Sequence, residues 1–107
     1  MPADIFDDLM AQIHRRAKEL PAGSYTTKLI EGGVDLMGAK VREEAEEVIE
    51  ASETPDDREH VVYEACDLIY HLWVLLGSQG ISVDELRQEL LRREGVSGLV
   101  EKQNRKS

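Results

Sequence analysis

The sequence is poor in the residue types that mark cross-linked or membrane-spanning proteins. It holds one cysteine, three prolines, one tryptophan and one phenylalanine among 107 residues. A single cysteine, Cys66, excludes an intrachain disulfide, so nothing indicates an extracellular, disulfide-stabilised protein. No apolar run reaches the roughly 20 residues of a membrane span, and no alternating strand pattern is present. These absences favour a helical protein outside the membrane.

Basic residues are also scarce. Thirteen lysines and arginines face 22 aspartates and glutamates, which gives a formal net charge of −9. Such a charge argues against nucleic acid or an anionic membrane surface as a partner. The N-terminus lacks a basic segment followed by an apolar run, so we expect no signal peptide and a cytoplasmic protein. The length suits one domain over residues 1–107, with a polar tail from about residue 95.

Apolar residues recur at helical spacing in four segments, which predicts an all-α protein. The expected helices span about 4–20, 34–52, 55–76 and 82–93. Thr54 and Pro55 suggest an N-cap and first position for the third helix, and Ser82 and Glu85 a capping box for the fourth. Residues 21–33 are predicted to be a structured loop with room for one helical turn. Four helices in so short a chain give a marginal core, so we expect a homodimer or higher homo-oligomer.

Two acidic pairs lie in otherwise apolar helical stretches. Glu44 and Glu47 are three residues apart, as are Glu64 and Asp67, so each pair lies on one helix face. On a helical wheel Glu44 falls inside the apolar stripe, and Glu47 lies at its edge. The predicted third helix is apolar almost all round, apart from a strip that carries Glu64, Asp67 and His71. Such a helix belongs at a bundle centre or a subunit interface, and Cys66 is expected to be a small buried residue of it.

Four converging carboxylates require positive charge nearby. One lysine, Lys40 or Lys28, could form an ion pair with one acid but could not neutralise four. Oxygen ligands favour Mg²⁺, with Mn²⁺ as a substitute, and Mg²⁺ commonly joins protein carboxylates to phosphates. A di-iron bundle would need Glu-x-x-His pairs, which these helices lack. The sequence therefore predicts a magnesium site and phosphate chemistry.

Two further residues near the acids have alternative interpretations. His71 on an apolar helix is more typical of a hydrogen-bonded packing residue than of a catalytic one. Lys40 either pairs with Glu44 one turn later or reaches a substrate phosphate.

The acidic pattern resembles that of the all-α nucleoside triphosphate pyrophosphatases related to MazG. Those proteins carry Glu-Glu-x-x-Glu on one helix and Glu-x-x-Asp on the next, which match Glu43-Glu44-x-x-Glu47 and Glu64-x-x-Asp67 here. Further stretches resemble the phosphoribosyl-ATP pyrophosphatase family in particular. They are Gly23-Ser24-Tyr25-Thr26 with Lys28-Leu29, Lys40-Val41-x-Glu43-Glu44-Ala45, the run from Tyr63 to Leu72, Ser97-Gly98-Leu99 and Glu101-Lys102. The resemblance covers the chain from about residue 5 to 106.

The resemblance implies a helical bundle of four to five helices completed by dimerisation. It also implies hydrolysis of 1-(5-phosphoribosyl)-ATP to 1-(5-phosphoribosyl)-AMP and pyrophosphate, the second step of histidine biosynthesis. In that case Glu44, Glu47, Glu64 and Asp67 are the expected metal ligands, and Lys40 contacts phosphate. Glu43 or Glu47 orients or deprotonates water. The candidates for binding the nucleotide substrate are Ser24, Tyr25, Thr26 and Lys28.

Two alternative functions remain at this point. The shared acidic motif also fits a housekeeping pyrophosphatase for dUTP or damaged nucleotides. A non-catalytic helical interaction protein, with acids that only keep it soluble, belongs to a different class. The chain lacks the cyclohydrolase domain that some relatives carry, so the free-standing form is expected.

Overall fold

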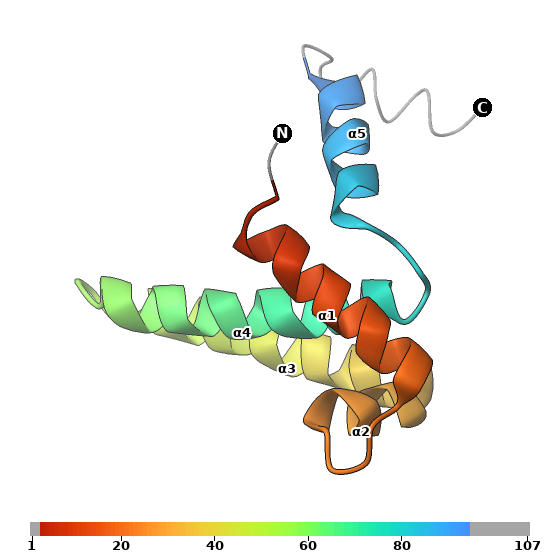
Figure 1. Ribbon diagram of the computed structural model, residues 1–107. Coiled ribbons are helices and arrows are strands. Elements are labelled where there is room, and N and C mark those ends of the chain that lie inside the picture. The colour runs from red at the N-terminus through yellow and green to blue at the C-terminus, as the bar shows by residue number, and fades with distance from the viewer. Residues whose placement is uncertain (1–2, 95–107) are drawn as a thin grey trace.

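The computed structural model describes residues 3–94, and this part of the chain is all-α, as predicted (Figure 1). No strand occurs within these residues. The tail motifs Ser97-Gly98-Leu99 and Glu101-Lys102 lie outside the described residues. The five helices are α1 (Ile5–Glu19), α2 (Tyr25–Glu31), α3 (Gly33–Ser52), α4 (Arg58–Gly77) and α5 (Val83–Arg93).

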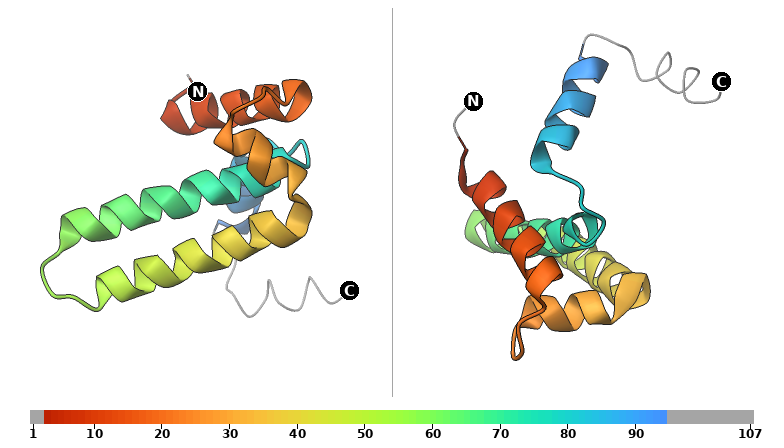
Figure 2. Two further views of the ribbon diagram at one scale, coloured as in Figure 1. Left: turned by 90° about the horizontal axis from the view of Figure 1, so that it is seen from below. Right: turned by 45° about the vertical axis from the view of Figure 1, so that its right-hand side comes forward.

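The two 20-residue helices α3 and α4 form an antiparallel pair along their length (Figure 2). Helix α1 packs across α4, and α2 packs against α1, α3 and α4 at one end of the pair. Helix α5 stands away from the pair and packs against α1. The antiparallel pair therefore brings the acidic motif of α3 opposite that of α4.

Side-chain caps fix most helix starts. The capping box of Ser82 and Glu85 is confirmed, and Asp4 forms another with Asp7 at the start of α1. Helix α2 occupies the segment expected to be mainly loop, and Ser24 caps it by accepting a hydrogen bond from the Thr27 amide at 3.3 Å.

The predicted start of α4 is wrong by three residues. Asp57, not Thr54, is the N-cap, and its carboxylate accepts a hydrogen bond from the His60 amide at 3.3 Å. Asp56 has a φ of 61°, which no helix interior allows. Pro55 therefore lies in the turn between α3 and α4 rather than at the first helical position.

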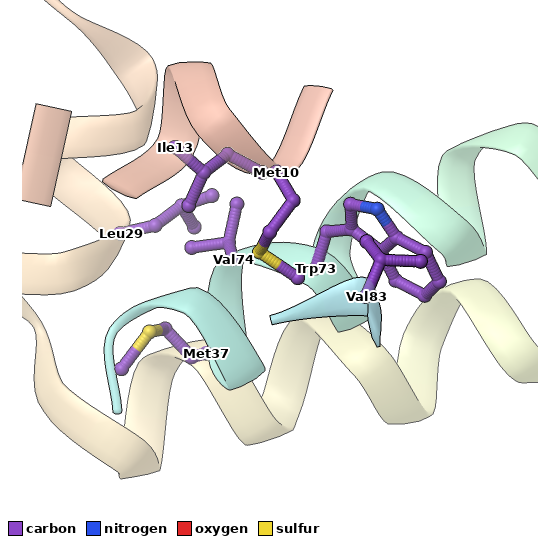
Figure 3. Packing of buried hydrophobic residues seen from close by; sticks show 7 residues of the cluster. All are labelled: Met10, Ile13, Leu29, Met37, Trp73, Val74 and Val83. Carbon is purple, nitrogen blue, oxygen red and sulfur yellow. The ribbon is translucent and has the colours of Figure 1, made fainter. Parts of the chain in front are cut away.

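The core is a small cluster at the place where α1 and α2 meet α4 (Figure 3). Its buried members are Met10, Ile13, Leu29, Met37, Trp73, Val74 and Val83. The Trp73 indole donates a hydrogen bond to the Phe6 carbonyl at 3.0 Å, so its one polar atom is satisfied. Gly77 lies directly beneath α1, since a Cβ built on it would come within 2.6 Å of Ile13 Cγ2.

The side of α4 that faces away from α1, α2 and α3 is open to solvent. Val62 and Tyr63 are more than half exposed, and Cys66 is exposed, so the expectation that Cys66 is buried is wrong for the single chain. Its position in the sequence gave only the side of the helix, not what covers that side. No helix in residues 3–94 is both long and apolar enough to cross a membrane.

Candidate metal centre

Three predicted ligands meet between α3 and α4. Glu44 and Glu47 come from the middle of α3, and Glu64 comes from the facing part of α4. Each offers one carboxylate oxygen, and these three oxygens all lie within 4.8 Å of one another. The i, i+3 spacing on α3 places its two acids on the side that α4 covers. The structure thus brings together three of the four predicted ligands, and that they bind a metal stays a prediction.

The three acids are buried to different degrees, and two of them have an oxygen without a hydrogen-bond donor in the described residues. Glu44 and Glu64 are 7% and 8% exposed, whereas Glu47 is half-buried. Within residues 3–94, neither Glu44 Oε2 nor Glu64 Oε2 has a hydrogen-bond partner. A buried carboxylate oxygen without a donor is costly to a fold, and natural proteins rarely contain one without a reason.

The pKa values of both buried acids are raised above their ordinary 4.5. Burial is the main cause of the raised pKa of Glu44, and the like charge of Glu47 adds to it. The pKa of Glu64 is raised first by Glu47, to which a protonated Glu64 can donate a hydrogen bond, then by burial and neighbouring negative charge. The cluster thus disfavours its own ionised form in the absence of a cation.

Asp67 lies one turn beyond Glu64 on α4 but is not among the three converging oxygens. It is half-buried, and its charge contributes to the raised pKa of both Glu44 and Glu64. It therefore lies within electrostatic range of the cluster, and its role as a fourth ligand stays a prediction.

The cluster suits a divalent cation on three observations. Its donors are all carboxylate oxygens, Glu44 and Glu64 each have a buried oxygen without a partner in the described residues, and neighbouring negative charge adds to the raised pKa of both. A hard cation such as Mg²⁺ would relieve all three conditions, because it takes oxygen ligands and offsets the charge. The residues present therefore fit the predicted metal.

Glu43 and Lys40 form a pair beside the cluster. Lys40 Nζ lies 3.2 Å from Glu43 Oε2, and this hydrogen bond raises the pKa of Lys40. Glu43 is exposed and is not among the three converging acids, whereas Lys40 is half-buried. In the structure Lys40 pairs with Glu43 rather than with Glu44, and its contact with a substrate phosphate stays a prediction.

Three of the four residues predicted to bind the nucleotide border a pocket of about 610 Å³ around the start of α2. Ser24, Tyr25 and Lys28 line it, with Tyr25 and Lys28 exposed. Thr26 is fully buried instead, and its hydroxyl lies 2.5 Å from the Tyr70 hydroxyl. In this arrangement Thr26 fixes α2 against α4. Contact with the substrate stays a prediction for all four residues.

Two residues near these sites were not singled out from the sequence. His60 Nε2 lies 3.5 Å from Glu64 Oε1, and an i, i+4 relation to Glu64 was the signal that could have found it. Thr27 is buried beside the α2 pocket, and its hydroxyl has no partner within the described residues. No sequence signal marked Thr27, because the segment was expected to be mainly loop.

Comparison with known proteins adds direct evidence. The sequence model of the family described as phosphoribosyl-ATP pyrophosphohydrolase matches residues 6–94. Over 101 residues the chain is 57% identical to phosphoribosyl-ATP pyrophosphatase of Rhodopirellula baltica, covering 92% of this chain and 84% of the relative. The corresponding protein of Metallosphaera sedula is 50% identical over 90 residues, covering 84% and 96%. The histidine biosynthesis bifunctional protein HisIE of Wolinella succinogenes is 43% identical over 102 residues, covering 95% of this chain and 44% of the relative.

Proposed function

The chain belongs to the phosphoribosyl-ATP pyrophosphohydrolase family, and from that membership we propose how its acidic cluster carries out the family reaction. The protein is a hydrolase that converts phosphoribosyl-ATP to phosphoribosyl-AMP and pyrophosphate in histidine biosynthesis. The convergence of Glu44, Glu47 and Glu64 is the observation that supports the proposed site. Family membership counts against both the dUTP alternative and the non-catalytic alternative.

Glu44, Glu47 and Glu64 hold Mg²⁺ in this proposal, and Asp67 is the fourth candidate ligand. When bound, the cation neutralises charge on the polyphosphate and the leaving pyrophosphate, and it lowers the pKa of coordinated water. Mn²⁺ would serve the same donors, since they are all oxygens.

The reaction adds water across the α–β phosphoanhydride bond. The oxygen of water joins one phosphorus, the bridging bond breaks, and a proton must be accepted. Glu47 is the better placed of the two candidate bases, because its half-buried carboxylate lies in the cluster and offers the metal one oxygen, which leaves the other to accept the proton. Glu43 is exposed and paired with Lys40, which is more consistent with orienting that lysine toward a substrate phosphate.

The other end of the substrate is assigned to the α2 pocket. Phosphoribosyl-ATP differs from ATP by a second ribose phosphate, which needs a cationic or hydroxyl-rich site of its own. Lys28 and Ser24 line such a pocket, and the exposed ring of Tyr25 forms part of its wall. We assign the added ribose phosphate to these three residues.

A homodimer is the proposed assembly, and the cytoplasm the proposed location. The single chain exposes Val62 and Tyr63 on α4 and Ile49 on α3, each by more than half. A second copy of this chain would cover these apolar side chains and enlarge a core that is small for one domain.

Pyrophosphate release tests the proposed function. Phosphoribosyl-ATP made in situ, ATP and dUTP are each supplied with Mg²⁺ or with EDTA. The proposal requires rapid release from phosphoribosyl-ATP with Mg²⁺ and little from the others. Equal release from dUTP would overturn the substrate, and release that survives EDTA would overturn the metal.

A further inference from the structure

One tyrosine joins the α2 pocket to the metal-site helices. Tyr25 is 49% exposed and lines the pocket with Ser24 and Lys28. Its hydroxyl reaches inward instead and lies 3.1 Å from Nε2 of His71 on α4. His71 is buried, so the hydrogen bond joins an exposed residue of the pocket to a buried residue of α4.

The orientation of His71 is fixed from its other nitrogen. His71 Nδ1 lies 2.8 Å from the backbone carbonyl of Asp67, and a carbonyl only accepts. Nδ1 therefore carries the proton in the neutral imidazole, and Nε2 accepts from the Tyr25 hydroxyl. The chain of donors runs from Tyr25 through His71 to the backbone of Asp67, a predicted metal ligand.

Aromatic and hydroxyl contacts also hold the start of α2 against α4. The Tyr25 ring stacks on Tyr70 with a centroid separation of 6.3 Å and an interplanar angle of 15°, and His71 lies edge-on to both rings. One residue along, the Thr26 hydroxyl bonds to the Tyr70 hydroxyl. Two successive residues of α2 are thus fixed to two successive residues of α4.

This arrangement lies within electrostatic range of the proposed reaction site. Tyr25 is among the groups that influence the pKa of Lys40, and His71 is among those that influence the pKa of Glu44. Tyr25 thus lines the pocket for the added ribose phosphate, and its partner His71 lies within electrostatic range of the carboxylate cluster.

We propose that the Tyr25–His71 hydrogen bond sets the position of the α2 pocket relative to the metal site, and so contributes to selection of phosphoribosyl-ATP over nucleotides that lack the second ribose phosphate. His71 is a positioning residue in this account, because it acts through Tyr25 and not on the substrate. The inference rests on the proposed function, in which the two ends of one substrate occupy the two sites.

Two variants separate positioning from packing. Tyr25→Phe keeps the ring and its stacking on Tyr70 but removes the hydroxyl. His71→Asn keeps a donor for the Asp67 carbonyl but no longer reaches Tyr25. Tyr63→Phe is the matched control, because it removes a tyrosine hydroxyl from α4 but keeps the ring that the proposed dimer would cover.

Product inhibition supplies the decisive measurement. Inhibition by phosphoribosyl-AMP reports the ribose-phosphate end, and inhibition by pyrophosphate reports the metal end. The expected result is that Tyr25→Phe and His71→Asn each weaken phosphoribosyl-AMP inhibition by about three- to tenfold and leave pyrophosphate inhibition unchanged. Phosphoribosyl-AMP should inhibit the double variant no more weakly than it inhibits the more affected single variant, because both substitutions remove the same hydrogen bond.

Other outcomes contradict the inference in distinguishable ways. Unchanged phosphoribosyl-AMP inhibition in Tyr25→Phe would overturn it, even if His71→Asn proved too unstable to assay. Equal weakening of both inhibitors, together with a lowered melting temperature, would assign the pair to packing alone. If the wild-type protein neither hydrolyses phosphoribosyl-ATP nor binds phosphoribosyl-AMP, the proposed function fails before the inference is tested.

Discussion

Glu44 is a buried acid, and whether it stabilises or destabilises the folded protein depends on a bound cation. Its side chain is 7% exposed, one of its oxygens has no hydrogen-bond partner in residues 3–94, and its pKa is raised mainly by burial. A metal-free protein therefore carries an unfavourable charge at this position at neutral pH, whereas a bound cation makes the same carboxylate favourable.

Replacing Glu44 with Gln should change stability in opposite directions with and without Mg²⁺. In EDTA at pH 7 we expect Glu44→Gln to raise the melting temperature, by roughly 4–8 °C for each 1 kcal/mol of relieved charge burial. With Mg²⁺ the wild type should gain thermal stability and the variant should gain little. Thermal denaturation followed by circular dichroism measures both.

The pH dependence of that difference follows from the sign of the shift. A raised folded-state pKa means that the unfavourable ionisation is absent below the ordinary 4.5 and fully present above the folded-state value. The higher melting temperature of Glu44→Gln in EDTA should therefore disappear at pH 4. Glu46→Gln on the exposed side of α3 is the control and should show neither effect; a lower melting temperature for Glu44→Gln in EDTA would contradict the account.

Helical spacing in the sequence predicted where the carboxylates lie, but it did not predict which side chains contact their neighbours. Glu44 interrupts an apolar stripe, so helical spacing alone placed it inside the bundle. The pairing of Lys40 with Glu43 instead of Glu44 depends on lysine rotamers at a half-exposed site, which spacing does not fix. The burial of Thr26 depends on Tyr70 of another helix, and no local pattern carries that information.

At the scale of elements, α5 is held to the rest of the protein by few contacts. Arg87 donates two hydrogen bonds to the Asp7 carboxylate, at 2.9 and 2.6 Å, and Val83 is buried. His14 Nε2 also lies 2.9 Å from the Ile81 carbonyl before α5 begins. The bidentate pair thus joins the start of α1 to the middle of α5.

The Asp7–Arg87 pair makes the stability of this contact depend on pH. The hydrogen bonds from Arg87 hold the pKa of Asp7 well below its ordinary 3.8. A lowered folded-state pKa contributes stability above the ordinary value and loses it as the pH falls toward the folded-state value. Asp7→Asn should therefore lower the melting temperature at pH 7, and the gap to wild type should narrow below pH 3.8.

Asp8→Asn is the matched control for that experiment, because Asp8 is an exposed acid in the same first turn of α1. It removes the same charge near the helix N-terminus but leaves the ion pair intact. An equal effect of Asp8→Asn at pH 7 would show that the helix terminus, and not Arg87, explains the loss.

The crossing of α1 over α4 depends on a glycine. Gly77→Ala would place a methyl group 2.6 Å from Ile13 Cγ2 and 3.1 Å from Met10 Sδ, so α1 would have to move. We expect destabilisation by about 1–3 kcal/mol. Gly38→Ala in the middle of α3, where nothing lies within 4 Å, should stabilise by about 0.5–1 kcal/mol. Urea denaturation of the two variants tests the contrast, and two effects of equal sign would contradict it.

Element boundaries show where sequence patterns fail. Capping residues of α5 were predicted correctly, because Ser82 and Glu85 satisfy both orphan amides locally. Thr54 and Pro55 carried a similar signal, yet the chain turns through Asp56 before α4 begins. The competing cap, Asp57, was equally plausible by residue type, so only the geometry of the α3–α4 turn decides between them.

At the scale of the whole molecule, the fold class was fully predictable but the assembly is not determined by one chain. The antiparallel α3–α4 pair leaves Val62 and Tyr63 of α4 exposed. Such residues are explained most simply by a second copy that packs against this pair.

A charge at the proposed interface should therefore prevent self-association. Tyr63→Glu is expected to sediment as a monomer at concentrations where the wild type sediments as a dimer. Leu90→Glu on α5, also 66% exposed, is the comparison for loss of an equally exposed apolar residue outside the α3–α4 pair. Sedimentation velocity separates the outcomes, and a monomeric wild type would rule out the proposed dimer.

The most direct test of the account is cation binding by the α3–α4 cluster. Free Mn²⁺ gives a strong electron paramagnetic resonance signal that falls on binding, so a titration reports affinity without substrate. We predict that the wild type binds Mn²⁺, that Mg²⁺ competes, and that Glu64→Gln weakens binding by at least about tenfold. Glu46→Gln should bind as the wild type does. Binding by Glu64→Gln that equals the wild type would contradict the assignment of this cluster as the metal centre.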